Sequence, residues 1–406
     1  MKPNQVLLYS IEIFTIIIVI YYISLYQSFR FLNKVQLCYL FIFNSIVCLF
    51  NAYISGKDGD IFHYFNDSKV LYYFLDQNFF KYYQVLFKNG GGFIPRILAE
   101  PLFEIGHWGN PSMYFMVKAF TWSSLFSSSN IYNISLFFSL SSFTAKYFSL
   151  RILELFKIEK TGFYIAIFIL FFSGLDSFFI TGMYKENFIF LFLIYIIYYF
   201  LSQKTYVKTA VFLLFLYYLY YLKPHLVGVI YLVVLIYCIY KLYIYKQFFY
   251  NLIISFLVGF HLIMIKKFHI IEYIITKKTQ FNSLKGGTTN KEVINFSDSA
   301  IDSILVFFKS ILSIFISPLD IISLNFKSII INYSNFSFIF IFLFLIRRLY
   351  FYNKFIFYYL VIIGIISLFF IGFIVPNYGA QLRYRSVYMI ILIITLLQFN
   401  IRKINI

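Results

Sequence analysis

The chain contains few charged residues for its length. Asp, Glu, Lys and Arg make up only 12% of its 406 residues, whereas 61% are hydrophobic, and the mean hydropathy is +0.81. A soluble domain carries about a quarter charged residues. This deficit excludes an ordinary soluble protein, because water could not solvate such a surface, and it predicts that lipid covers most of the chain.

Patterns that bind metals or cofactors are also scarce. Cys38, Cys48 and Cys238 lie inside apolar segments without metal-ligand spacing, so we interpret them as small buried side chains. His, Cys, Asp and Glu form no cluster with ligand spacing. The Gly286-Gly287 pair lacks the GxxxxGK[ST] context of a phosphate-binding loop. The sequence therefore predicts no metal and no cofactor.

Long apolar runs, in contrast, are frequent. A membrane-spanning helix needs about 20 apolar residues, within a range of about 17–25, and only helices satisfy the backbone of such runs in lipid. The sequence thus predicts an all-α polytopic membrane protein, one domain over residues 1–406 with about eleven transmembrane helices. The predicted spans are 6–27, 35–54, 131–150, 161–182, 187–202, 207–222, 226–243, 248–265, 329–346, 355–375 and 387–401.

The positive charges predict an orientation. The formal net charge is +18, but Lys and Arg sit in short clusters at segment ends, which suits anionic lipid head groups rather than nucleic acid. Clusters follow every second span, so the positive-inside rule predicts an external N-terminus and a cytoplasmic C-terminus. The clusters comprise Arg30, Lys34, Arg151, Lys157, Lys160, Lys204, Lys208, Lys241, Lys246, Arg347, Arg348, Lys354, Arg402 and Lys403.

The external face then receives two large loops, about 55–130 and 266–328. Each contains an interrupted apolar segment. We interpret 112–128 as an interfacial helix, and 302–325 either spans the membrane or lies on it. Counting neither as a span preserves the alternation of charge.

Acidic residues open the first external loop. Asp60 and Tyr64 are spaced i, i+4 and would share one face of a helix, with His63 between them. A carboxylate here could take a proton from a sugar hydroxyl or orient it. The alternative is a hydrated loop with ordinary acids.

Two short turns on the same face also carry charge. Lys185 and Glu186 are adjacent, and since adjacent helical residues do not face each other, we expect each to have another partner. In the Lys223-Pro224-His225 turn, Lys223 could meet a phosphate and His225 could shuttle a proton. The alternatives are a structural ion pair for the first turn and, for Lys223, a side chain that reaches to the interface.

Arg383-Tyr384-Arg385 precedes the last span on the external face. Two arginines in a short external turn contradict the positive-inside rule. This exception makes them candidate functional residues. Guanidinium groups bind phosphates bidentately and stay charged. A lipid-linked diphosphate is the obvious anion at this depth, and anchoring to lipid head groups is the alternative.

Together these motifs resemble a family. The acidic Asp-x-x-x-Tyr motif, the Lys-Glu pair, the Lys-Pro turn and the Arg-Tyr-Arg turn, with the many-span layout, resemble bacterial polymerases of O-antigen and capsule repeat units. These are related to the glycosyltransferase-C superfamily of membrane enzymes. The resemblance covers the whole chain in layout, and its motifs are short.

The resemblance implies an inner-membrane enzyme of lipopolysaccharide or capsule biosynthesis. Its donor would be an oligosaccharide on polyprenyl diphosphate at the periplasmic face, and a chain-length regulator is a candidate partner. An acceptor hydroxyl would attack the donor's anomeric carbon, and the lipid diphosphate would leave.

The resemblance also implies roles for the residues named above. Arg383 and Arg385, with Lys223, would stabilise the diphosphate, and Asp60 would act as the base, with His225 or His63 as competitors. The remaining candidate site residues are Lys185, Glu186 and Tyr64, which would bind the substrate.

Two other functions stay open. A glycosyltransferase-C enzyme would add one sugar from a polyprenyl-phosphate donor, although that family usually places its acidic loop after the first span and here it follows the second. A lipid-linked oligosaccharide flippase should keep charges inside its spans, and here such charges are few, Asp176 and Lys146 among them. We also expect no pair of broken helices in inverted repeats.

Overall fold

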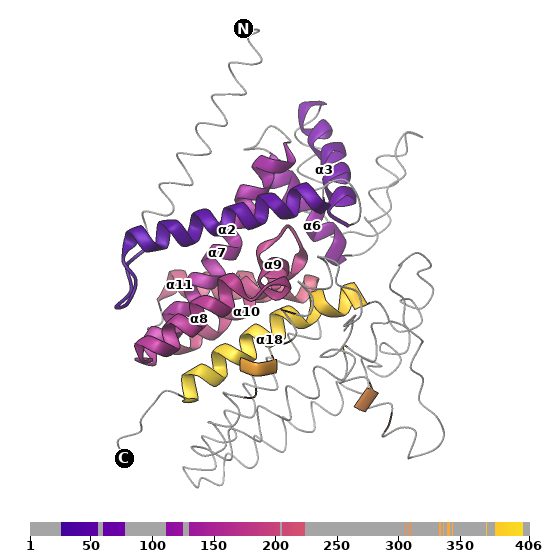
Figure 1. The fold of residues 1–406 in the computed structure, drawn as a ribbon. Helices are drawn as coiled ribbons and strands as arrows, with labels where there is room; N and C mark the ends of the chain where they lie inside the picture. The colour runs from indigo at the N-terminus through magenta and orange to yellow at the C-terminus, as the bar shows by residue number, and fades with distance from the viewer. Residues whose placement is uncertain are drawn as a thin grey trace, which may run out of the picture.

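In the computed structural model, the described residues are 26–55, 60–77, 111–124, 130–203, 205–223 and 378–400, with scattered positions between 305 and 371. The elements within these ranges are all helices, so the described part of the chain has the predicted all-α class (Figure 1). They are α2 (Lys34–Ser55), α3 (Asp60–Gln77), α6 (Pro111–Ser124), α7 (Ile131–Leu155), α8 (Lys160–Phe172), α9 (Leu175–Thr181), α10 (Lys185–Leu201), α11 (Tyr206–Leu222) and α18 (Tyr378–Asn400).

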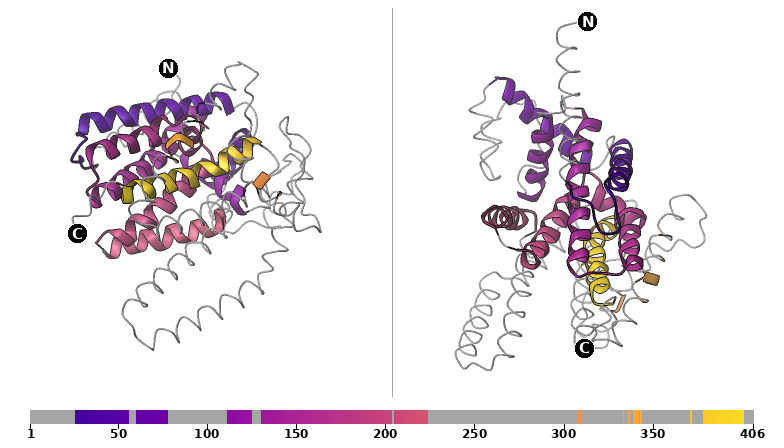
Figure 2. Two further views of the ribbon diagram at one scale, coloured as in Figure 1. Left: turned by 60° about the horizontal axis from the view of Figure 1, so that its bottom comes forward. Right: turned by 90° about the vertical axis from the view of Figure 1, so that its left-hand side faces the viewer.

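Helix α7 lies at the centre of the bundle. It packs against α2 on one side and α10 on the other, and α11 packs on α10. Helix α18 comes from the far end of the sequence but lies beside α9, α10 and α8 in both sets of views (Figures 1 and 2). This arrangement brings the first turns of α18 to the end of the bundle where α9 and α10 meet.

Helix α2 has its polar residues inside and its apolar residues outside. Asn44, Ser45 and Asn51 are buried against α7 and the turn after α9, where they are hydrogen-bonded. The outward stripe is apolar and each member is more than half exposed: Val35, Tyr39, Ile42, Ile46, Phe50, Tyr53 and Ile54. At 1.5 Å per residue this stripe is about 29 Å long, close to the ~30 Å hydrocarbon core of a bilayer.

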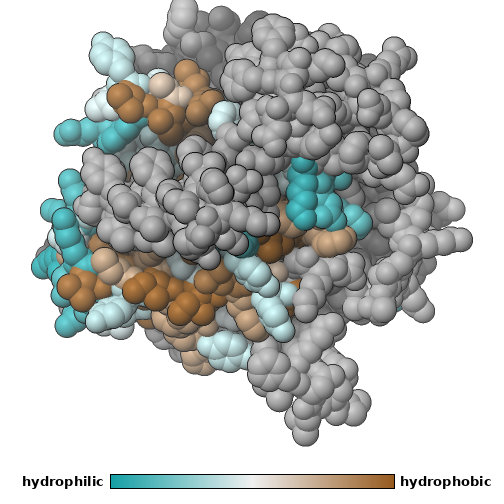
Figure 3. Space-filling view, turned by 90° about the horizontal axis from the view of Figure 1, so that it is seen from above, coloured by the Kyte–Doolittle hydropathy of each residue, from teal (hydrophilic) through white to brown (hydrophobic). Residues whose placement is uncertain are grey.

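The described surface of the bundle is also largely apolar. Seen from above, brown apolar residues cover much of the described surface, and teal hydrophilic residues gather in separate groups toward its ends (Figure 3). Large exposed apolar surfaces mark membrane or partner contacts. This surface is therefore suited to lipid.

The predicted span 161–182 is broken in two. Helices α8 and α9 meet at an angle of 71°. Between them Ser173 ends α8, and Gly174 adopts φ 70°, a left-handed conformation that glycine reaches without steric cost. The Ser177 hydroxyl donates to the Leu170 carbonyl across the break at 2.8 Å, which satisfies a carbonyl that the interrupted helix leaves open.

The described residues do not support the predicted number of eleven spans. Among them, Lys34–Ile54 of α2 is the one helix long and apolar enough to cross a bilayer, and the bent pair of α8 and α9 would be a second if it forms one span. Helices α10 and α11 have 17 residues each, at the lower end of the range for a span. The predicted spans 226–243 and 248–265 lie outside the described residues, as do nearly all of 6–27 and of 355–375 and most of 329–346.

Much of the segment 112–128 is helical, as α6. This helix packs on α3 and buries Met116, Val117 and Phe120 completely. It thereby holds the start of α3 near the bundle, which matters because α3 begins with Asp60.

The opposite end of the bundle is basic. Arg151, near the end of α7, donates to the carbonyls of Gln27 and Ser28 and pairs with Glu154. Lys157 and Lys160 follow in exposed positions. Because α7 and α10 each run the length of the bundle, this basic end is separated from the start of α10 and α18.

Candidate functional site

A chain of charges connects three helices. The Arg383 Nη1 atom donates to the Asp60 carboxylate at 2.9 Å, and its Nε atom lies 3.5 Å from the Glu186 carboxylate. Asp60 begins α3, Glu186 lies in the first turn of α10, and Arg383 lies near the start of α18. Residues 323 positions apart in sequence are thus in direct contact at one end of the bundle.

The two carboxylates of this chain differ in environment. The Asp60 side chain is 42% exposed, whereas the Glu186 side chain is 1% exposed. Neither Glu186 oxygen accepts a hydrogen bond from the described residues, and Arg383 Nε donates none to them. A buried carboxylate without hydrogen bonds is costly, so this position is suited to a ligand that brings hydroxyl or N–H donors.

Three cations surround the Tyr384 ring. The Lys223 Nζ atom lies 4.2 Å from the ring centroid, Lys185 Nζ lies 5.4 Å from it, and the Arg383 guanidinium carbon lies 5.3 Å from it. Lys223 caps the C-terminal end of α11, so four helices contribute to the group when Asp60 of α3 is included. The expectation that Lys185 and Glu186 have separate partners is confirmed.

The cluster shifts the proton affinity of its members. Burial alone would raise the pKa of Tyr384, but Lys185, Lys223 and Arg383 outweigh it and lower the pKa to about 7. Burial lowers the pKa of Lys223 to about 8, although the Tyr384 phenolate opposes this shift. For Arg383, burial opposes protonation, but Glu186 and the other anions raise the pKa well above its usual value.

Tyr64 lies beside the cluster on α3. It lies one turn after Asp60 on the same helix, as its spacing predicts, and its side chain is buried. Burial, followed by the charge of Asp60, raises the pKa of Tyr64 above its usual value. Tyr64 is therefore a neutral hydroxyl at physiological pH.

The turn before Lys185 is held by two asparagines. Asn51 of α2 accepts a hydrogen bond from the Met183 N–H at 3.0 Å. The Asn187 amide donates to the carbonyls of Phe138, Thr181 and Gly182 at 2.9, 3.3 and 3.2 Å. Both asparagines are buried, so the backbone that presents the Lys-Glu pair is fixed to α2 and α7.

Arg385 lies in a different environment from Arg383. Its guanidinium pairs with Asp176 of α9 at 3.3 Å, and the Ser386 hydroxyl donates to the same carboxylate at 2.9 Å. Arg385 is 2% exposed and Asp176 is 1% exposed. The predicted phosphate-binding role of Arg385 stays a prediction, and this geometry instead gives Arg385 a link between α18 and α9.

Lys146 is the second charge predicted inside a span. It is buried in α7 and donates to Asn44 at 2.8 Å and to Thr181 at 2.6 Å. Its Nζ atom also lies 4.5 Å from the Phe171 ring centroid. Lys146 therefore connects α2, α7 and both halves of the broken helix.

The structure describes one of the two candidate histidines. His63 lies on α3 but is exposed, and its ring stacks edge-on with Phe62. His225 lies outside the described residues. Among the described residues, no group of three or more His, Cys, Asp and Glu could hold a metal ion.

Three residues that build the site have no predicted role of their own. They are Tyr384, which lies between the two arginines of its motif, and the buried Asn51 and Asn187. Asn51 and Asn187 sit in or beside apolar runs, where an uncharged polar residue needs a partner, and this could have marked them.

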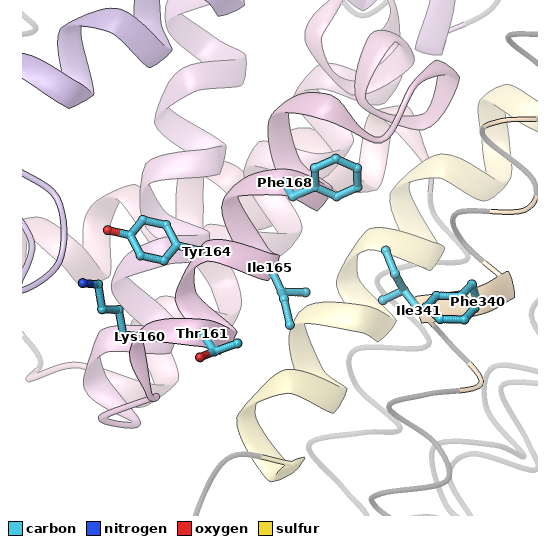
Figure 4. Close-up of a pocket in the computed structure, with 7 residues that line it drawn as sticks. All are labelled: Lys160, Thr161, Tyr164, Ile165, Phe168, Phe340 and Ile341. Atoms are coloured by element: carbon cyan, nitrogen blue, oxygen red, sulfur yellow. The ribbon is translucent and has the colours of Figure 1, made fainter.

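A shallow pocket lies elsewhere, between α8 and the described residues near 340. Figure 4 shows mostly aromatic and aliphatic side chains around it. Its lining residues are Lys160, Thr161, Tyr164, Ile165, Phe168, Phe340 and Ile341. It contains no member of the charged cluster and no acid, so we do not place the chemistry there.

Comparison with protein-family models, with curated protein sequences and with solved structures finds no match for this chain.

Proposed function

We propose that the chain is an integral-membrane glycosyltransferase that polymerises polyprenyl-diphosphate-linked oligosaccharide repeat units at the periplasmic face. The observation that supports it most is the contact of Asp60, Glu186 and Arg383, with Lys185 and Lys223 close by, at one end of the bundle. Such a site has carboxylates for a hydroxyl and cations for a diphosphate.

In the proposed reaction, the oxygen of an acceptor hydroxyl attacks the anomeric carbon of the donor. The hydroxyl proton passes to a carboxylate, Asp60 or Glu186. The bond between the anomeric carbon and the diphosphate oxygen breaks, and the lipid diphosphate leaves with the electron pair. Arg383 and Lys223 stabilise the negative charge that develops on it, which is commonly the largest catalytic contribution.

The membrane topology belongs to the same proposal. The chain crosses the plasma membrane about eleven times, with the basic end of the described bundle in the cytoplasm and the charged cluster outside. The apolar outer stripe of α2 and the separation of the two ends support it. Cysteine labelling at residue 63 and at residue 160, from each side of the membrane, tests it: equal access from the same side would contradict it.

Deletion and complementation in the native host test the activity. We expect the deletion strain to display single repeat units in place of long surface-polysaccharide ladders. The wild-type gene and Lys160→Ala, a matched cation at the basic end, should restore the ladder, and Arg383→Ala should not. Unchanged ladders after deletion would exclude the polymerase, and loss of one terminal sugar would instead indicate a single-sugar transferase.

Two observations favour a flippase as the second candidate. Broken helices and buried ionisable residues at membrane depth are typical of transporters, and the bundle has both in the α8–α9 break and the Arg385–Asp176 pair. The same deletion discriminates the two functions. A strain without the flippase would display no repeat unit outside, whereas a strain without the polymerase would display single units.

A further inference from the structure

Tyr384 occupies an unusual position in the charged cluster. Its ring is approached by Lys223 from the end of α11, by Lys185 from α10 and by Arg383 from its own helix. Cations attract the face of an aromatic ring only modestly, by about 0.5–2 kcal/mol. Three of them around one ring repel each other, so they require a negative charge close by.

The carboxylates of the cluster only partly supply that charge. Asp60 and Glu186 are both engaged by Arg383, and within the described part of the chain two acids face three cations. Among these described groups, one positive charge is therefore in excess when Tyr384 is neutral. The charge of the group is balanced when the Tyr384 hydroxyl is ionised, and the surrounding cations lower the pKa of Tyr384 to about 7 against the opposing effect of burial.

We propose that Tyr384 exchanges its proton with ligand binding: as a phenolate it balances Lys185, Lys223 and Arg383 in the free protein, and it takes up one proton when a phosphate or diphosphate group binds against these cations. The use of this step in transfer rests on the proposed function, whereas the step itself does not. After proton uptake, the Tyr384 hydroxyl is a neutral donor that can hydrogen-bond to the bound phosphate oxygen.

The surroundings of Tyr384 on the described helices are consistent with one ionisable centre. The described charged and titratable groups that act on it are Tyr64, Lys185, Glu186, Lys223, Arg383 and Tyr388, and Asp60 contacts Arg383. The anions Asp60 and Glu186 are already engaged with Arg383, and Tyr64 stays neutral because its pKa is raised. Tyr384 is thus the group of this set whose protonation changes near neutral pH, with Lys223 next at about 8.

The sign of the pH dependence follows from linkage. Below about pH 7 Tyr384 is already neutral, so anion binding needs no proton. Above about pH 7 each binding event must return a proton to the phenolate, so the affinity for the anion falls by about tenfold per pH unit. Tyr384→Phe should remove this dependence and leave only the later fall when Lys223 loses its charge.

The experiment uses the purified full chain in detergent and needs no transfer activity. We expect the near-ultraviolet absorbance to show one tyrosinate at pH 8 that Tyr384→Phe lacks and that Tyr164→Phe, an exposed tyrosine of α8, retains. Adding inorganic diphosphate should abolish this signal with uptake of one proton per chain. A wild-type protein without this tyrosinate, or a tyrosinate that persists when diphosphate is bound, would overturn the proposal.

A second variant and a second set of ligands complete the test. Lys223→Met keeps Tyr384 but removes one of its cations, so the pKa of Tyr384 should rise. An unchanged pKa would contradict the proposed effect of the surrounding cations. Farnesyl diphosphate and phosphatidylglycerol micelles distinguish the source of the phosphate. A response to farnesyl diphosphate at lower concentration than to phosphatidylglycerol supports a donor site, and a response to phosphatidylglycerol alone would overturn that assignment.

Discussion

Two regions at the start of α18 use the same residue type for different purposes. Arg383 belongs to the charged cluster, where its partners are the half-exposed Asp60 and the buried Glu186. Arg385, two residues later, is enclosed with Asp176 and Ser386. Residues i and i+2 point to different sides of a helix, so the two guanidinium groups have different partners in this structure.

The difference between the regions lies in charge balance and access. In the Arg385 region, the described contacts pair one buried cation with one buried acid and add a hydroxyl. As far as the structure describes it, the Arg383 region has three cations for two acids, and its buried Glu186 carboxylate accepts no hydrogen bond from the described residues. We infer that the first region stabilises the fold and that the second binds the substrate.

The strongest test of this contrast is Asp176→Ala. It leaves the buried Arg385 charge without its acid, which should cost about 3–5 kcal/mol of stability. We expect little folded protein in membranes and a lower Tm in detergent. Replacing the pair together, Asp176→Leu with Arg385→Met, should recover much of the stability. A wild-type Tm for Asp176→Ala would show that the pair is not structural.

Arg383→Ala should act mainly on activity. Removing a preorganised cation from a site of developing charge costs about 100-fold to 1000-fold in rate. Arg383→Lys keeps a charge beside Glu186 but not the fork of donors, so we also expect a large loss of chain extension from it. The ladder assay gives the activity and the Tm gives the fold. Normal ladders from both variants would remove Arg383 from the site.

Gly182→Ala tests how the site is held in place. An alanine Cβ atom would lie 2.6 Å from the Asn51 side chain, which accepts the Met183 N–H. Crowding of this kind costs about 1–3 kcal/mol, and we expect both Tm and activity to fall. The matched variant Gly182→Ala with Asn51→Ala removes the clash. If the double variant has a lower Tm and a lower activity than Gly182→Ala alone, the clash is not the cause.

Asp60→Asn should have the smallest effect. It keeps a hydrogen-bond acceptor beside Arg383 and removes only the charge, so just part of the about 1.5–3 kcal/mol that a hydrogen bond to a charged group contributes is lost. If Glu186 is the base, we expect about a tenfold fall in rate for Asp60→Asn and a larger one for Glu186→Gln. The reverse order would assign the proton transfer to Asp60.

Local features of the fold could be predicted from the sequence. The span 35–54 matches α2, and the i, i+4 spacing of Asp60 and Tyr64 corresponds to one helix, α3. Both follow from short-range patterns of apolar and polar residues. The break of 161–182 is not predictable in this way, because a hydropathy pattern does not detect one glycine at positive φ within an apolar run.

The sequence by itself determined the apolar composition, the helical class of the described part and the grouping of positive charge at segment ends, because these depend on residues close together in the chain. Only the tertiary structure decided which charges meet. Arg383 contacts Asp60 across 323 positions while Arg385 turns toward Asp176. Such pairings depend on how α3, α9, α10 and α18 pack, and a linear pattern contains no information about that packing.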